Sequence, residues 1–101
     1  MSLVASVVTY TVEPSNAEEL RQRVQEHLVP AAQALPGYRG FLLLDQGDGR
    51  RIAILFFETP EQVRAAQAAL TPVGEEHTYA LMSGPAIGSM ARVLIDDGVL
   101  G

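Results

Sequence analysis

His77 is the residue of this sequence that best fits a catalytic role. It lies on the apolar side of a predicted helix, after Glu75 and Glu76 and before Tyr79. A histidine that is partly buried in a pocket can act as a general base near neutral pH. The same pattern also fits a packed or rim histidine with one hydrogen bond, because most helical histidines are not catalytic. We therefore name His77 as a candidate catalytic residue and keep the structural alternative open.

Tyr10 and Arg51 are the other candidates, and each has a structural alternative. Tyr10 lies on a predicted strand, and its hydroxyl would need a partner if the ring points into a pocket, where it can take part in proton transfer. Arg51 begins another predicted strand and can orient an acidic ligand. Otherwise Tyr10 is an aromatic strand residue that packs through its ring, and Arg51 is a charge beside a hairpin.

His27 is the second histidine, and its surroundings do not predict a metal site. Glu26 is its sequence neighbour, and neighbours in a helix point to different sides, so this pair lacks metal-ligand spacing. We expect His27 to pack at the solvent edge. No other grouping of His, Asp and Glu suggests a metal, and the glycines lack the strand–glycine–helix context of a phosphate loop. We predict no metal and no cofactor.

The composition argues against several other classes of function. The net charge of −5 repels a phosphate backbone and argues against nucleic-acid binding. The sequence has no cysteine, which excludes disulfides, thiolate catalysis and cysteine metal sites. No apolar run approaches the ~20 residues that span a bilayer, and the first residues lack the basic and apolar segments of a leader. We expect one globular domain over 1–101, in the cytoplasm and without membrane contact.

Four segments have the residue types of β-strands. They are rich in β-branched, aromatic and aliphatic residues and are bounded by proline or glycine. A glycine-rich hairpin loop at 46–49 joins the second to the third. A loop at 83–88 precedes the fourth, and a tail at 97–101 follows it. The predicted strands are 3–12, 41–45, 50–58 and 91–96.

Two helical regions separate these strands. Ser15 is the predicted N-cap of the first, with Glu18 completing a capping box, and Pro30 predicts a kink or break near 26–29. The second begins at Thr59 and Pro60 in the same manner, with Gln62 three residues after the cap. Its apolar stripe runs from Val63 to Leu81, interrupted at 71–72 by Thr-Pro. We expect two helices there, or one that bends.

The third strand predicts both the architecture and the oligomer. Alternate side chains of a strand point to opposite faces, and here both sets are apolar: Ile52, Ile54 and Phe56 on one face, Ala53, Leu55 and Phe57 on the other. The element order predicts an α+β fold, a ferredoxin-like split βαββαβ with a four-stranded antiparallel sheet. Its first and third strands are central, and both helices cover one face. An uncovered apolar face usually marks an interaction site, so we expect a homodimer through it.

Two motifs resemble a known family. Pro36-Gly37-Tyr38-Arg39-Gly40-Phe41 and Phe56-Phe57-Glu58-Thr59-Pro60-Glu61 are similar to the dimeric α+β barrel superfamily, in particular the antibiotic-biosynthesis-monooxygenase-like domains. There a Pro-Gly-aromatic turn precedes the second strand and an aromatic-acid-Ser/Thr step ends the third. The resemblance covers nearly the whole chain. It implies a homodimer whose two sheets pack into a barrel, with a pocket between sheet and helices in each subunit.

The resemblance leaves the activity open. Haem-degrading members use a first-strand Asn, a Trp and a His as iron ligand, whereas this sequence has no Trp and its only Asn, Asn16, begins a helix. Only His77 lies near the ligand position, so haem degradation is disfavoured. The first hypothesis is a cofactor-free monooxygenase-like enzyme that acts on a small apolar or aromatic metabolite, with His77 or Tyr10 handling the proton. The alternatives are a non-catalytic binding or sensing dimer and a dimer with no ligand.

Overall fold

A computed structural model describes residues 2–100 of the chain. Met1 and Gly101 lie outside the described residues, so the predicted tail at 97–101 is described only up to residue 100. Four strands and two helical regions follow one another in the predicted order. The elements are β1 (Val4–Thr11), α1 (Pro14–Arg23), the π-helix η1 (Val24–Leu28), α2 (Val29–Gln33), β2 (Gly40–Gly47), β3 (Arg50–Phe57), α3 (Pro60–His77), the 3₁₀ turn η2 (Tyr79–Leu81) and β4 (Ile87–Arg92).

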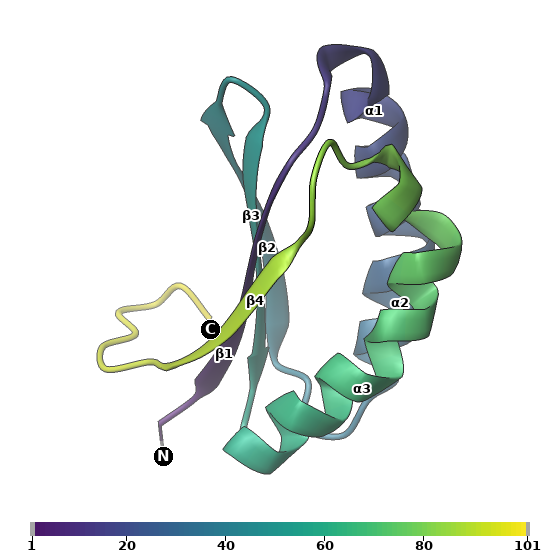
Figure 1. Ribbon diagram of the computed structural model, residues 1–101. Coiled ribbons are helices and arrows are strands. Elements are labelled where there is room, and N and C mark those ends of the chain that lie inside the picture. Colours follow the sequence, from purple (N-terminus) through teal and green to yellow (C-terminus); the bar gives the residue numbers. More distant parts are fainter. Residues whose placement is uncertain (1, 101) are drawn as a thin grey trace.

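The four strands form one antiparallel sheet with the order β2-β3-β1-β4. β1 and β3 are central, and the helices lie along one side of the sheet (Figure 1). The split βαββαβ prediction is therefore confirmed. The helix side contains the core, where Phe57 is fully buried and meets the ring of Tyr38 edge-on at a centroid distance of 6.1 Å. Among residues 2–100, no helix has both the length and the apolar composition needed to cross a membrane.

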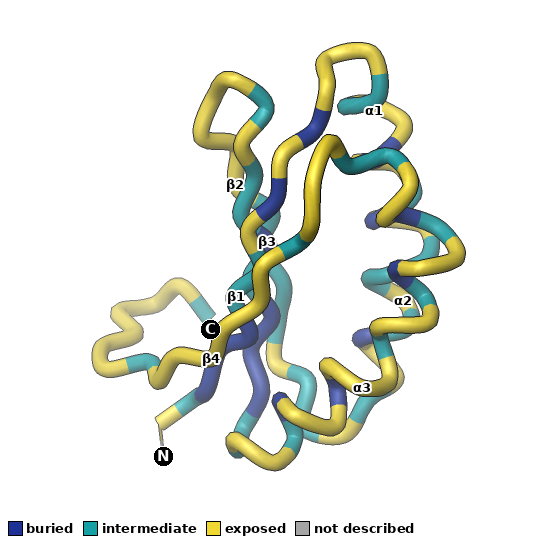
Figure 2. The backbone as a smooth tube through the Cα atoms, viewed as in Figure 1, coloured by how far each residue is buried: buried dark blue, intermediate teal, exposed yellow. Residues whose placement is uncertain are grey.

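The side of the sheet that faces away from the helices is apolar, as predicted. The register places Ile54 between Val7 of β1 and Leu42 of β2, and Ile52 opposite Leu44. Leu42 and Leu44 are 38% and 42% exposed, and we call this side the open face. The segment after β4 runs on the same side, away from the helices, and is mostly exposed (Figures 1 and 2).

Helix α3 begins at the predicted capping box. The Thr59 hydroxyl accepts a hydrogen bond from the Gln62 N–H at 3.2 Å, and the Gln62 side-chain oxygen accepts from the Thr59 and Glu58 N–H groups, each at 3.1 Å. The corresponding prediction for the first helix is wrong. α1 begins at Pro14, with Glu13 in the N-cap position and no side-chain cap, because the fixed φ of proline favours the first helical position.

The two prolines inside helical regions have different effects. Pro30 follows η1, a stretch of π-helix, which confirms the predicted break although it spans Val24–Leu28 rather than 26–29 alone. At Thr71-Pro72 the prediction of two separate helices is wrong, because α3 continues through Pro72 to His77; the alternative, one helix that bends there, stays a prediction. Residues 68 and 72 are both exposed, so water can reach the carbonyl group that loses its N–H donor.

The predicted last strand is shifted along the chain. Strand β4 is Ile87–Arg92, so it begins inside the segment predicted as a loop and ends before most of 91–96. It is an edge strand whose residues are all exposed, and Gly88 and Ser89 lie opposite Val8 and Val7 of β1. An exposed edge strand needs no alternation of apolar and polar residues, which explains the error.

The Pro-Gly-Tyr turn before β2 depends on a glycine for two reasons. Gly37 has a φ of +79°, in the left-handed region that side chains disfavour. A Cβ at this position would also collide with the side chain of Gln62, which caps α3. The turn and the start of α3 are therefore packed against each other, which fixes where the helix begins over the sheet.

We predict that Gln62→Ala destabilises the fold by about 1–2 kcal/mol, because it leaves the Glu58 and Thr59 N–H groups without their acceptor. Urea unfolding followed by circular dichroism measures this change. Gln33→Ala is the matched control, since Gln33 is exposed at the end of α2. Equal stability of the two variants would contradict the role given to the capping box.

Candidate functional site

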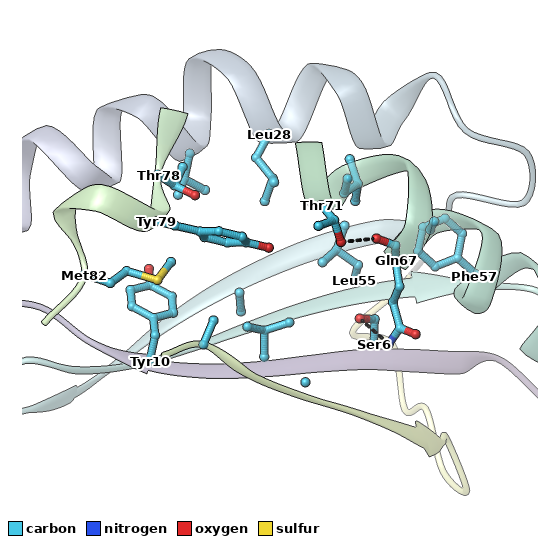
Figure 3. A pocket seen from close by; sticks show the side chains of 17 residues that line it. Ser6, Tyr10, Leu28, Leu55, Phe57, Gln67, Thr71, Thr78, Tyr79 and Met82 are labelled. Carbon is cyan, nitrogen blue, oxygen red and sulfur yellow. Dashed lines mark hydrogen bonds between the residues drawn. The ribbon is translucent and has the colours of Figure 1, made fainter. Parts of the chain in front are cut away.

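A cavity of about 300 Å³ lies between the sheet and the helices. This volume is at the lower end of the range for small-molecule sites. Seventeen residues line it, and most of them are apolar (Figure 3). Within the described chain, residues 2–100, no Asp, Glu, Lys, Arg or His contributes to this lining. The polar side chains of the lining are Ser6, Tyr10, Gln67, Thr71, Thr78 and Tyr79.

The cavity exists because small residues face each other across it. Ala53 on β3 and Gly88 on β4 belong to its floor, while Ala66 belongs to its α3 wall. A Cβ added to Gly88 would meet no atom within 4 Å. Val24 and Leu28 line the cavity from η1, where π-helical winding changes the direction of successive side chains. The helices therefore rest on the sheet at both ends and leave a space between.

One wall of the cavity contains three polar residues that two hydrogen bonds connect. The Gln67 amide on α3 donates to the hydroxyl of Ser6 on β1 at 3.5 Å, a long contact, and Ser6 is only 4% exposed. The Thr71 hydroxyl donates to the Gln67 carbonyl oxygen at 2.7 Å. These groups are neutral, so they can hydrogen-bond to a ligand but cannot act as bases at neutral pH.

Tyr10 lies in the cavity lining, at the end formed with Met82 (Figure 3). Burial raises the pKa of the Tyr10 phenol above its ordinary value of 10.0, and the positive charge of Arg51 offsets only part of this effect. Tyr10 therefore stays protonated at neutral pH. It can donate a hydrogen bond to a ligand oxygen, and it is a proton donor rather than a base.

Arg51 and His77 lie outside the cavity lining. Arg51 is opposite Tyr10 in the sheet, and its guanidinium donates to the Asp45 carboxylate at 2.7 Å, so its charge is already paired. His77 stacks on His27 of η1, with ring centroids 3.7 Å apart and planes 2° from parallel. Its carbonyl accepts a hydrogen bond from Arg23 at 3.1 Å. The pair of histidines connects α3 to η1 above the cavity instead of lining it.

The sequence reasoning did not identify Gln67 and Tyr79 as site residues. Val63, Gln67 and Thr71 follow one another at intervals of four residues on α3, so one line of side chains changes from apolar to polar along the helix. This change from apolar to polar side chains was the feature of the sequence that could have identified Gln67. Tyr79 gave no such signal, because it follows the end of α3 and its direction depends on the turn η2. Within residues 2–100, no group of three or more metal-ligating side chains occurs.

No family model matches the sequence, and no curated protein matches it. Solved structures match it over nearly its whole length. SnoaB, a cofactor-independent oxygenase from Streptomyces nogalater, is 19% identical, with 95% of this chain and 97% of that chain covered and a TM-score of 0.75. The monooxygenase from the gene ActVA-Orf6 of Streptomyces coelicolor, in complex with the ligand nanaomycin D, is 17% identical, with 95% and 91% covered and a TM-score of 0.73.

A third structure has a different described activity. The heme-degrading protein Rv3592 from Mycobacterium tuberculosis is 23% identical, with 96% of this chain and 97% of that chain covered and a TM-score of 0.70. The three likenesses confirm the predicted split βαββαβ fold, which solved structures described as putative antibiotic biosynthesis monooxygenases share. One fold thus accommodates oxygenases and a heme-degrading protein, and at these identities the likeness shows the fold alone.

We predict that Tyr10 makes the folded state sensitive to alkali. Because its pKa is raised on folding, its contribution to stability is complete below pH ~10 and is lost as the pH rises through the folded value. The unfolding free energy of the wild type should therefore fall more steeply above pH ~10 than that of Tyr10→Phe. Denaturant unfolding at a series of pH values measures both slopes, and identical slopes would contradict the burial of the Tyr10 hydroxyl.

Proposed function

We propose that the cavity binds a small, mainly apolar aromatic molecule that carries a hydroxyl or carbonyl oxygen. Three observations support this. The volume of about 300 Å³ suits a molecule of two or three fused rings, the walls are mainly aliphatic and aromatic, and the polar side chains are all neutral. A charged ligand would lose its hydration without gaining a counter-charge, so we expect a neutral one.

We further propose that the protein oxidises this molecule with O₂ and without a cofactor of its own. Such an oxygenase must take its electrons from the substrate, so the substrate must be electron-rich, as phenols are. For a phenol with a free ring C–H, one oxygen atom of O₂ becomes the new quinone carbonyl and the other leaves as water, which takes the hydrogen of that C–H bond and the hydrogen of the phenolic hydroxyl. The shared fold with SnoaB, described as a cofactor-independent oxygenase, supports this reading.

Of the three candidate residues that the sequence offers, Tyr10 is the one that we assign to this chemistry. Its raised pKa keeps its proton available for an oxygen anion that develops on the substrate or on reduced O₂. In this proposal His77 stabilises the contact between α3 and η1 through its stack on His27, and Arg51 pairs with Asp45. Neither reaches the bound molecule.

A non-catalytic binding protein is the second candidate, and one observation favours it. None of the lining residues that the structure describes carries an imidazole, carboxylate or amine, so none of them is a base that could remove a phenolic proton at neutral pH. Haem is a poor fit as a substrate for a related reason. The histidines lie outside the lining, stacked on each other, so neither is placed to bind an iron inside the cavity.

We also propose that a second copy of the chain covers the open face. Leu42, Leu44, Ile52 and Ile54 form an apolar surface on the two neighbouring strands β2 and β3, and no helix of residues 2–100 covers it. The tail approaches this side, because the heavy atom nearest to an ideal Cβ on Gly40 belongs to the side chain of Leu100. A dimer removes this surface from water, which is a gain of roughly 25 cal/mol for each Å² of apolar area.

One experiment tests ligand binding in the cavity and oxidation of the ligand together. 1,5-Dihydroxynaphthalene should bind to the wild type, and with O₂ it should give 5-hydroxy-1,4-naphthoquinone and one water, measured by quinone absorbance and oxygen uptake. Gly88→Phe should abolish binding, because the new ring fills open space in the cavity, whereas Gly88→Ala should keep it.

The outcomes separate the candidates. Binding with quinone formation supports the oxygenase, and binding without oxygen uptake supports the non-catalytic protein. Equal binding by Gly88→Phe and the wild type would contradict the proposed cavity altogether.

A charge introduced on the open face tests the proposed dimer. Leu42→Glu should raise the dimer dissociation constant ~100-fold or more, because a carboxylate would be buried against an apolar surface. Leu42 is already 38% exposed in the single chain, so the variant should still fold. Light scattering after gel filtration measures the mass. Gln33→Glu adds the same charge on the helix side and is the control; a wild type that is monomeric at micromolar concentration would overturn the dimer.

A further inference from the structure

Gly74 is a glycine inside α3 whose missing side chain is replaced by another residue. An ideal Cβ on Gly74 would stand 2.5 Å from Cε1 and Cζ of Tyr79 and 2.8 Å from its hydroxyl oxygen. The phenol end of Tyr79 therefore lies directly against the helix backbone. Glycine is unfavourable inside a helix, and Gly74 lies in an ordinary helical conformation, so this contact is the visible reason for a glycine here.

The backbone on both sides of Tyr79 is fixed. Thr78 is 3% exposed, and both its N–H and its hydroxyl donate to the Gly74 carbonyl oxygen, at 2.9 and 3.1 Å. The carbonyl of Tyr79 accepts a hydrogen bond from the Met82 N–H at 3.1 Å. Tyr79 thus begins η2 in one defined orientation, and its ring extends across the cavity with the hydroxyl directed inward (Figure 3).

Tyr79 differs from Tyr10 in its access to solvent. Tyr79 is 41% exposed although it lines the cavity, whereas Tyr10 is 6% exposed. Figure 3 draws no hydrogen bond between the Tyr79 hydroxyl and the other lining residues, so within that lining the hydroxyl is available to an incoming molecule. Because the Tyr79 ring belongs to both the lining and the surface, it is placed where a ligand would enter.

We propose that Tyr79 determines the specificity of the cavity, and that Gly74 makes its position possible. The Tyr79 hydroxyl forms a hydrogen bond with the hydroxyl or keto oxygen of a flat aromatic ligand, and its ring packs against the ligand ring. This inference rests on the proposed ligand-binding function and names the group that selects oxygenated over plain aromatic ligands. A site that hydrogen-bonds a ligand oxygen discriminates against the analogue without it.

Two probes that differ only by one hydroxyl test this proposal. The chain has no Trp, so the fluorescence of 1-naphthol and of naphthalene can be followed during titration. The wild type should prefer 1-naphthol. Tyr79→Phe should weaken 1-naphthol binding roughly fivefold to tenfold, the usual effect of one neutral hydrogen bond, and leave naphthalene binding unchanged. A purely structural role for Tyr79 would change the two affinities equally.

Gly74→Ala tests the second part. The methyl group should displace the phenol ring, so the variant should lose 1-naphthol affinity at least as far as Tyr79→Phe. Its helix content and stability should stay at wild-type level or rise, because alanine favours a helix. In a Tyr79→Ala background, Gly74→Ala should have no further effect on binding, since the ring that it displaces is absent.

The outcomes distinguish this inference from the proposed function. A wild type that binds neither probe overturns the proposed function and this inference with it. A wild type that binds 1-naphthol while Tyr79→Phe binds it equally well overturns only the inference. Additive effects of Gly74→Ala and Tyr79→Ala would overturn the role of Gly74. If Gly74→Ala does not fold, Tyr79→Phe with the two probes decides the question alone.

Discussion

The structure depends on a sheet that is apolar on both faces while the chain supplies helices for only one. Alternation along β3 directs Ala53, Leu55 and Phe57 toward the helices and Ile52 and Ile54 away from them. An apolar face is stabilised when another element or molecule covers it. The helices cover one face and leave a cavity over its centre, and we propose that a second subunit covers the other. Fold, oligomer and site all follow from this division.

The cavity is the consequence of how the helices are supported. At one end, Phe57 packs under the start of α3 with Val63, which is fully buried. At the other end, Leu20 of α1 is packed against Tyr10 and Val12. Between these two contacts the facing residues are small, and the winding of η1 changes the direction of its side chains. A fully packed interior would be more stable, so the space comes at a cost in stability, which supports the proposed ligand.

The neutral lining constrains the chemistry more than any single residue does. Two tyrosines, Tyr10 and Tyr79, are among the lining residues, and each has a hydroxyl that can donate a hydrogen bond. Such a site can orient a phenol, exclude water and stabilise an oxygen anion, but it leaves the supply of electrons to the ligand. Candidate substrates are therefore molecules that are easily oxidised, and a protein with the same lining can also serve only to hold them.

Much of the fold could be predicted from the sequence, because hydrophobic period and turn residues are local signals. The apolar run of β3, the capping box of Thr59 and Gln62, and the break before Pro30 all gave correct elements. β4 was misplaced because an exposed edge strand has no hydrophobic pattern. Pro72 did not break α3, because its side of the helix is open to water.

The site could be predicted only in part, because a period does not say which neighbour a helix face meets. The apolar stripe of α3 contacts both the sheet and η1, and His77 lies on the η1 side, against His27. Tyr10 was correctly placed on a strand, and the strand period alone could not decide which face it joins. Tyr79 depends on a vacancy at Gly74 that only three-dimensional contacts reveal.

Isotope-filtered nuclear Overhauser measurements on a mixture of ¹³C-labelled and unlabelled chains test the central claim most directly. The account predicts contacts between subunits at the methyl groups of Leu42, Ile52 and Ile54, and none at those of Val8 and Leu55, which face the cavity. Intersubunit contacts confined to the outer surface of the helices, or a complete lack of them at millimolar concentration, would contradict it.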